Sequence, residues 1–204
     1  MLNGKMETIK SPFSGIEKKL GRNLEMSADN DDESRMNLKE ARFLYHGTTS
    51  DRLYEIKEAE ALLPSKKHKH GTNFLKSLKS AIYLTTSITR AIYWSRLLTE
   101  RDGGRQIILK IPKEDICEKL SRDKNLIWDA TSFQAEDAKI TTFEVIEEND
   151  FWNEIRKAYG FTNGFPAKDY VEIRYSIDRN RGIRATLSEI PESFKANIGY
   201  AGLK

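Results

Sequence analysis

From residue 43 onward, the chain alternates short apolar runs with amphipathic stretches. Short runs rich in aromatic and β-branched side chains are typical of strands, whereas apolar residues three and four apart are typical of helices. Strands interspersed with a few helices predict an α+β fold with a split, mostly antiparallel sheet. The expected strands are 43–47, 81–85, 105–111, 140–146, 170–175 and 183–187, and the expected helices begin near residues 50, 88, 113, 151 and 189.

Three of these helices have capping residues at their expected starts. Thr49 or Ser50 follows the first strand, Ser87 follows the second, and Asp150 precedes an amphipathic stretch that ends at Gly160. Side-chain oxygens at such positions accept hydrogen bonds from the free backbone N–H groups of the first helical turn. Late in the chain, a turn over residues 178–182 predicts a hairpin between the strands 170–175 and 183–187.

The length of 204 residues favours one domain, which we expect over residues 42–204. Residues 1–41 contain an acidic cluster and few large apolar side chains in their second half. A segment without an apolar face cannot bury enough surface to offset its ordering entropy. We therefore expect a flexible or loosely docked N-terminal arm.

Composition excludes several classes of protein. No run of 18 apolar residues is present, and the first ten residues have no apolar core of a secretory signal, so we expect a cytoplasmic protein with no membrane partner. The single cysteine, Cys117, excludes an intrachain disulfide, and with three scattered histidines we expect no metal site. A net charge of +3 is too small to predict nucleic-acid binding by itself.

Three local motifs carry chemistry. Tyr45-His46-Gly47-Thr48 ends the first strand, and Tyr83 lies in a second strand that leads into a helix bearing Tyr93. An acidic residue, Asp169 or Glu172, lies in the expected late strand. A histidine-glycine strand end, a tyrosine strand with an aromatic helix, and a late carboxylate follow one another in that order.

This order resembles the ADP-ribosyltransferase superfamily of the poly(ADP-ribose) polymerase and diphtheria-toxin type. The resemblance covers roughly residues 43–187, and about twenty positions carry it. It implies an ADP-ribosyltransferase-like fold that takes NAD+ as a substrate, without a metal. It also implies mono-ADP-ribosyl transfer to a macromolecular acceptor, either protein or nucleic acid, and the size suits a bacterial or phage effector or toxin.

The resemblance implies roles for individual residues. The backbone of Gly47 and the rings of Tyr83 and Tyr93 would hold the nicotinamide, and His46 would bind a ribose hydroxyl of the adenosine half. The family has a serine on the helix after the tyrosine strand, where this chain has Arg90 with Thr89 beside it. The candidate NAD+ contacts are therefore His46, Gly47, Thr48, Tyr83, Thr89, Arg90 and Tyr93.

The catalytic carboxylate has two candidates. The resemblance favours an acidic residue at the start of a late strand, which selects Asp169, whereas Glu172 has the family's usual side chain. On a strand, residues three apart face opposite sides, so only one of the two can enter the site. Asp169 shares its face with Val171 and Ile173, as expected of a carboxylate at the edge of a buried site, and we favour it slightly.

Two other interpretations remain open. The related NAD-dependent RNA 2′-phosphotransferase has a similar histidine-glycine-threonine start, but it needs a second histidine and several arginines in its site. A catalytically inactive module that binds NAD+ or ADP-ribose needs no carboxylate at all. The basic loop over residues 65–80 is interpreted as a solvated loop, with a clamp for the NAD+ pyrophosphate or for a nucleic-acid acceptor as the alternative.

Overall fold

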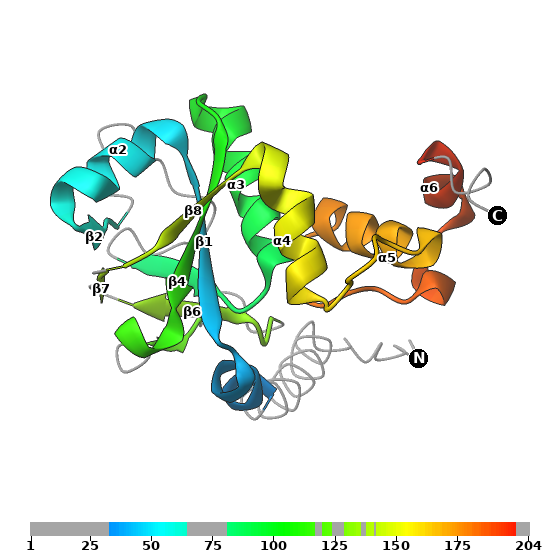
Figure 1. The fold of residues 1–204 in the computed structure, drawn as a ribbon, viewed down its shortest axis with the longest axis horizontal. Coiled ribbons are helices and arrows are strands. Elements are labelled where there is room, and N and C mark those ends of the chain that lie inside the picture. The colour runs from blue at the N-terminus through cyan, green and yellow to red at the C-terminus, as the bar shows by residue number, and fades with distance from the viewer. Residues whose placement is uncertain are drawn as a thin grey trace, which may run out of the picture.

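A computed structural model describes residues 33–64, 81–116, 120–123, 129–135, 138–140 and 142–198. It has an α+β fold, as predicted, with helices packed on an antiparallel sheet (Figure 1). The basic loop 65–80 and residues 1–32 lie outside the described residues. The strands are β1 (Phe43–Thr49), β2 (Ala61–Leu62), β3 (Ile82–Thr85), β4 (Gln106–Pro112), β5 (Ser121–Arg122), β6 (Ser132–Ala135), β7 (Ala138–Lys139) and β8 (Glu144–Glu147). The α-helices are α2 (Ser50–Ala59), α3 (Ile88–Asp102), α4 (Phe151–Ala158), α5 (Ala167–Asp178) and α6 (Glu192–Asn197), with 3-10 turns at η2 (Lys113–Asp115), η4 (Glu148–Asp150) and η5 (Leu187–Glu189).

The main sheet has six strands in the order β5-β6-β3-β1-β4-β8, and all neighbours are antiparallel. The strands β2 and β7 form a separate two-stranded sheet. Both edges of the main sheet are short, because β5 has two residues and β8 has four. The two central strands are β3, which carries Tyr83, and β1, which carries the first sequence motif.

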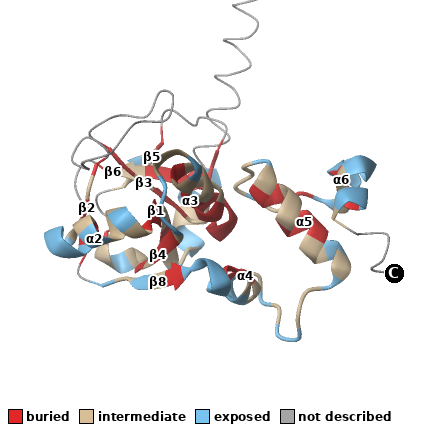
Figure 2. Ribbon diagram, turned by 90° about the horizontal axis from the view of Figure 1, so that it is seen from above, coloured by how far each residue is buried: buried red, intermediate tan, exposed pale blue. Residues whose placement is uncertain are grey.

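Each face of the sheet is covered by its own core. On one face, Leu44, Leu84 and Leu109 pack with Ile56 of α2. On the other face, Tyr45 and Ile108 pack with apolar residues of α3, α4 and α5, including Ile92 and Ile173. Figure 2 shows the buried residues gathered on the sheet and on the helix faces turned toward it. The alternation of β1 between two apolar cores is the reason why it can lie at the centre of the sheet.

The sheet is split between β1 and β3. The ladder between β1 and β4 runs from Phe43↔Pro112 to Thr49↔Gln106, along the whole of β1. The ladder between β1 and β3 has a single pair, Tyr45↔Thr85. Beyond that pair, the His46 ring reaches the carbonyl of Tyr83 on β3. The predicted mostly antiparallel sheet is confirmed, and the first motif lies where the ladder between β1 and β3 ends.

The predicted strand 170–175 and its hairpin are wrong, because residues 167–178 form α5. Ile173 and Ile177, one helical turn apart, face the core shared with α3 and α4. Val171 and Tyr175 face a second, smaller core with Phe194. A helix that is buried on two sides has apolar residues at both alternating and helical spacing. The spacing of apolar residues therefore does not distinguish such a helix from a strand.

A helix over residues 33–40 packs on the domain. Ser34 is buried, Leu38 packs against the core that contains Leu44 and Ile111, and the amide of Asn37 donates to the carbonyl of Ala130 at 3.2 Å. The ammonium of Lys113 caps the end of this helix, since its Nζ donates to the carbonyls of Leu38 and Lys39 at 3.0 and 2.8 Å. Residues 33–41, which we assigned to the arm, therefore belong with the domain. Among the residues that the structure describes, no helix combines the length and the apolar character needed to cross a bilayer.

Candidate functional site

The side chain of His46 bridges the split in the sheet. Its Nδ1 lies 2.8 Å from the carbonyl oxygen of Tyr83 on β3. A carbonyl only accepts, so Nδ1 must carry the proton, and in the neutral ring Nε2 is then an acceptor. Both residues are half-buried. The first two sequence motifs, 37 residues apart, thus meet at one point of the sheet.

Gln134, on the strand next to β3, is a site residue that our sequence analysis missed. It lies directly opposite Tyr83 in the β3–β6 ladder, so the two side chains share a face. The Oε1 of Gln134 is buried and accepts no hydrogen bond in the structure. A buried amide oxygen without a donor is costly, and such groups are rare enough to need a reason. The alternation of Phe133, Gln134 and Ala135 was the available sequence signal, but the run is only four residues long.

Gly47 allows α3 to lie directly on the sheet. A Cβ at this position would lie 2.8 Å from the backbone nitrogen of Ser95 and closer still to the carbonyl oxygen of Ala91. The hydroxyl of Ser95 in turn donates to the carbonyl of Thr48 at 2.8 Å and accepts from the backbone N–H of Ile107 at 3.0 Å. The side-chain face of Gly47 is therefore filled by the helix, and only its backbone groups remain as candidates for ligand contact.

Two of the threonines expected to contact NAD+ are buried. Thr48 is 1% exposed, and its hydroxyl is buried without a hydrogen-bond partner. Thr89 is 0% exposed and lies in the first turn of α3, where its hydroxyl donates to the carbonyl of Arg181 at 3.3 Å. Burial raises the pKa of Tyr159, and a hydrogen bond with Thr89 partly opposes that rise. Thr89 therefore packs α3 against the α4–α5 region instead of facing a ligand.

Arg90 forms a buried ion pair with Asp129. Its Nη2 lies 2.8 Å from Asp129 Oδ2, with both side chains 2% exposed, and its Nη1 donates to the carbonyl of Asn180. Burial lowers the pKa of Arg90, and the Asp129 carboxylate opposes that effect. Arg90, which we expected at the nicotinamide contact, is thus buried and bound to internal partners.

Tyr93 lies on α3 among side chains other than Tyr83. Its ring packs edge-on against Trp94 at 5.4 Å between centroids, and the guanidinium of Arg96 lies over it at 5.5 Å. Arg96 also binds Asp178 at 2.8 Å, which links α3 to the end of α5. The ring of Tyr93 therefore packs on neighbours in its own helix, and Arg96 supplies the link from this group to α5.

Asp169 and Glu172 lie on α5, and both bind Arg184. Asp169 pairs with Arg184 Nη1, and Glu172 Oε2 lies 3.1 Å from Arg184 Nε. Glu172 also accepts the backbone N–H of Leu187 at 2.9 Å. On a helix, residues three apart share a side, so the choice between the two by strand geometry was wrong. Their contacts hold the segment after α5 against the helix.

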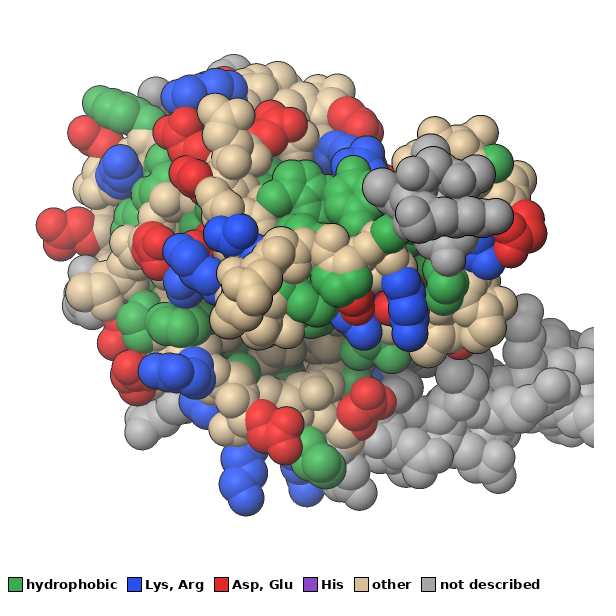
Figure 3. Space-filling view, turned by 45° about the vertical axis from the view of Figure 1, so that its right-hand side comes forward, with side chains coloured by type: hydrophobic (Ala, Val, Ile, Leu, Met, Phe, Trp, Pro, Cys, Tyr) green, Lys and Arg blue, Asp and Glu red, His purple; other side chains and the backbone are tan. Residues whose placement is uncertain are grey.

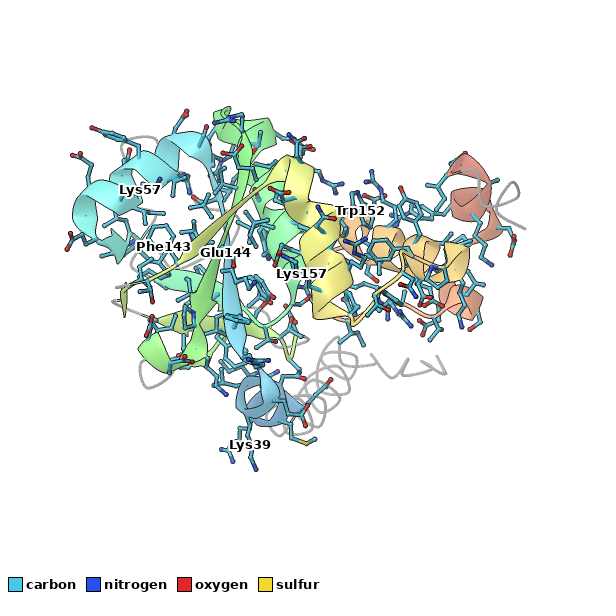
Figure 4. The ribbon with its side chains drawn as sticks, viewed as in Figure 1. Lys39, Lys57, Phe143, Glu144, Trp152 and Lys157 are labelled. Carbon is cyan, nitrogen blue, oxygen red and sulfur yellow. The ribbon has the colours of Figure 1, made fainter. Side chains whose placement is uncertain are left out.

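The helices α4 and α5 carry a second group of aromatic side chains. Trp152 extends from α4 toward α5 and stacks on Tyr170 at 4.9 Å, with Phe165 edge-on to it at 5.5 Å (Figure 4). Hydrophobic side chains gather on this side of the molecule, with Lys and Arg around them (Figure 3). Lys157, labelled on α4, binds the buried Glu154, which also accepts Lys110 at 3.0 Å. These residues close the core between α4, α5 and the sheet.

The pKa values of Glu154, on α4, and Lys110, on β4, are shifted by burial and by their hydrogen bonds. Burial alone would raise the pKa of Glu154, but hydrogen bonds from Lys157 and Lys110 outweigh it and lower the pKa. Burial would likewise lower the pKa of Lys110, but its bonds to Glu154 and Glu144 raise it. Glu144, at the start of β8, lies 3.0 Å from Lys110 Nζ (Figure 4). Glu154 and Lys110 thus each favour the charged form of the other.

The structure brings the His46 ring to the backbone of Tyr83, beside Gly47. It places the side chains of Tyr83 and Gln134 together on the sheet face of Tyr45, whereas His46 belongs to the face of Leu44. The phenol of Tyr83 and the carboxamide of Gln134 can donate and accept hydrogen bonds, and the tyrosine ring can cover a flat group, which suits a polar ligand with a planar head. Within the described ranges, no three His, Cys, Asp or Glu side chains gather in a way that could hold a metal ion. Comparison with family models, curated proteins and solved structures returns no significant match.

Proposed function

We propose that the chain is an NAD+-dependent mono-ADP-ribosyltransferase whose site lies at the split between β1 and β3. One observation supports this above the others: the Nδ1 atom of His46, in the first motif, lies 2.8 Å from the backbone carbonyl oxygen of Tyr83, in the second. The two residues are 37 positions apart in the sequence, and the resemblance, not their spacing, assigned them to one site. The proposal also covers a macromolecular acceptor, which takes up the ADP-ribose.

The proposed reaction breaks the bond between the ribose C1′ and the nicotinamide nitrogen. Nicotinamide leaves with the bonding electrons, a nucleophilic atom of the acceptor forms the new bond to C1′, and that atom gives up its proton. In this proposal Tyr83 covers the nicotinamide ring, the Gly47 backbone binds its carboxamide, and His46 orients a ribose hydroxyl. Gln134, opposite Tyr83, offers its amide oxygen to a ribose hydroxyl.

The neutral side chain of Gln134 favours a second candidate, a module that binds NAD+ or ADP-ribose without turnover. An oxocarbenium-like transition state is stabilised by nearby negative charge, and an amide supplies only a dipole. Asp169 and Glu172, the carboxylates that we expected to supply the charge, are bound to Arg184. Binding without nicotinamide release is the behaviour that would distinguish this second candidate.

Both candidates are tested by one pair of measurements on the purified full-length chain. Calorimetry measures NAD+ binding, and chromatography measures free nicotinamide after incubation with NAD+ and a cell lysate as the source of acceptor. The transferase predicts both signals, the binding module predicts binding alone, and the absence of both refutes the proposed site.

Matched variants assign any signal to the site. We expect His46→Ala and Tyr83→Ala each to lose most nicotinamide release while the circular dichroism stays that of the parent chain. Tyr175→Ala is the control, since Tyr175 is also a half-buried tyrosine but packs on Phe194 at 5.1 Å between α5 and α6. Equal losses in Tyr83→Ala and Tyr175→Ala would show that the effect comes from lost packing.

A further inference from the structure

The guanidinium of Arg90 joins segments that are far apart in the sequence. It lies in the first turn of α3, shortly after β3, and it binds both Asp129, three residues before β6, and the carbonyl of Asn180 after α5. The planar fork of an arginine can serve two acceptors in fixed directions at once. The pair therefore sets how β6 and the segment after α5 lie against the beginning of α3.

Asp129 binds the residues at the beginning of β6 and just before it. Its Oδ1 accepts the backbone N–H and the hydroxyl of Thr131 at 2.9 and 2.7 Å, and its Oδ2 accepts the hydroxyl of Ser132. The Thr131 carbonyl in turn accepts the N–H of Thr86, just after β3, at 3.0 Å. Ser132 is the first residue of β6, and Gln134 follows two residues later on the same face.

The segment after α5 is fitted closely against this group. A Cβ on Gly182 would lie 2.7 Å from Asp129 Oδ1 and 3.1 Å from Arg90 Nη2. Asn180, whose carbonyl Arg90 binds, has a positive φ of 52°. A turn that adopts this backbone and leaves no room for a methyl group is held in one position by the ion pair.

We propose that Arg90 and Asp129 are positioning residues for the candidate site, because they fix the start of β6 and thereby the approach of Gln134 to Tyr83. The activity measurement that tests this inference rests on the proposed function. The structural measurement depends only on the position of Gln134. Neither residue touches the ligand. Both act through Gln134, two residues beyond the last group that Asp129 binds.

The test uses Arg90→Lys, which keeps the charge but lacks the planar fork that serves Asp129 and Asn180 in fixed directions. Ser132→Ala is the milder companion, since it removes one bond between Asp129 and β6, leaves the ion pair intact, and is used if the lysine variant does not fold. The control is Arg52→Lys. Arg52 forms a comparable ion pair with Asp102 at 2.7 Å, with side chains 11% and 10% exposed, but at the far end of α3.

The first measurement is independent of activity and follows the Gln134 side-chain amide by NMR, together with hydrogen exchange at the Gln134 backbone amide. We expect Arg90→Lys or Ser132→Ala to shift the side-chain signal and to speed up exchange, and Arg52→Lys to leave both unchanged. An unshifted Gln134 amide in both variants, or an equal shift in the control, overturns the positioning role. This comparison decides the inference even if the chain releases no nicotinamide, which would refute only the proposed function.

The second measurement is the kinetics of nicotinamide release per folded molecule. A misplaced contact in an otherwise intact site lowers kcat, so we expect Arg90→Lys to reduce kcat by about tenfold or more while KM for NAD+ changes by less than about threefold. The double variant Arg90→Lys/Gln134→Ala should be no slower than Gln134→Ala alone, because the arginine acts through Gln134. Additive losses in the double variant would contradict that route.

Discussion

Replacing Gly47 by alanine introduces a methyl group between β1 and α3. The new Cβ would lie 2.8 Å from the Ser95 nitrogen, closer than that to the Ala91 carbonyl oxygen, and 3.3 Å from the Ala91 carbonyl carbon. Cβ contacts under 3.0 Å are essentially never observed. All three obstacles are backbone atoms of a helix, so no side-chain rotation can relieve them. The helix must move away from the sheet.

The loss of stability can be estimated from the contacts that α3 makes with the sheet. Overpacking a core costs about 1–3 kcal/mol, and a rigid backbone obstacle belongs at the upper end. The retreat also stretches the two hydrogen bonds of Ser95 to Thr48 and Ile107, which adds about 1 kcal/mol. We therefore expect Gly47→Ala to lower the free energy of unfolding by about 4 kcal/mol. For a chain of this size that corresponds to a Tm lower by about 8–16 °C.

Urea denaturation and thermal circular dichroism measure the effect, with Gly160→Ala as the control. Gly160 has a φ of +74° and open space around the position of a Cβ, so alanine there meets backbone strain without a clash. We expect that control to cost about 1 kcal/mol. If Gly47→Ala unfolds within about 0.5 kcal/mol of the parent chain, the close approach of α3 is not what requires glycine.

Three further predictions concern stability. Glu172→Gln should lower the free energy of unfolding, measured by urea denaturation, by about 1–2 kcal/mol, because it breaks a mostly buried ion pair. Nicotinamide release per folded molecule should stay unchanged. A folded variant without activity would restore Glu172 as a catalytic candidate. The pKa of Glu154 is lower in the folded chain, so the unfolded chain binds more protons in acid, and the free energy of unfolding should fall as the pH drops below about 4.3. That fall should be less steep in Glu154→Gln. The pKa of Lys110 is higher in the folded chain, so the free energy of unfolding should also fall as the pH rises above about 10.4. Deleting residues 1–40 should cost about 2–3 kcal/mol more than deleting residues 1–32, because only the longer deletion removes the packed helix 33–40; equal Tm values would show that this helix contributes nothing.

Local signals in the sequence predicted the central part of the fold. The side chain of Thr49 accepts the N–H of Arg52 at the start of α2, and that of Ser87 accepts the N–H of Arg90 at the start of α3, as the capping pattern indicated. Asp150 does precede α4, but its side chain makes no capping hydrogen bond. Where a strand and a helix follow each other with a cap between them, neighbouring residues are sufficient to fix the boundary.

The secondary structure of residues 167–178 could not be predicted from a short stretch of sequence. Residues 170–175 alternate well enough for a strand, but Lys168 and Glu172, and Arg174 and Asp178, are pairs of opposite charge four residues apart. That spacing supports a helix and was the overlooked signal. The second core, which α5 covers with Phe194, comes from residues beyond the helix itself.

The candidate site was predicted in part. The contact between His46 and Tyr83 joins two motifs that the sequence singled out, although their resemblance to a family, and not their spacing, brought them together. Gln134 lies in a four-residue strand with little apolar character, so only the sheet register reveals it. Arg90 was assigned to the ligand because its partners Asp129 and Asn180 are 39 and 90 residues away, where no local pattern connects them.

The two outer strands of the sheet have a consequence for the behaviour of the chain at high concentration. An exposed strand edge is a template on which a second molecule can add its own strand, and long apolar edges are the most prone to aggregation. Here one edge ends after two residues, and the other carries Glu144 and Glu147 with side chains about half exposed. A second copy that paired with β8 in antiparallel register would bring like charges together. The sheet therefore resists growth at both of its ends.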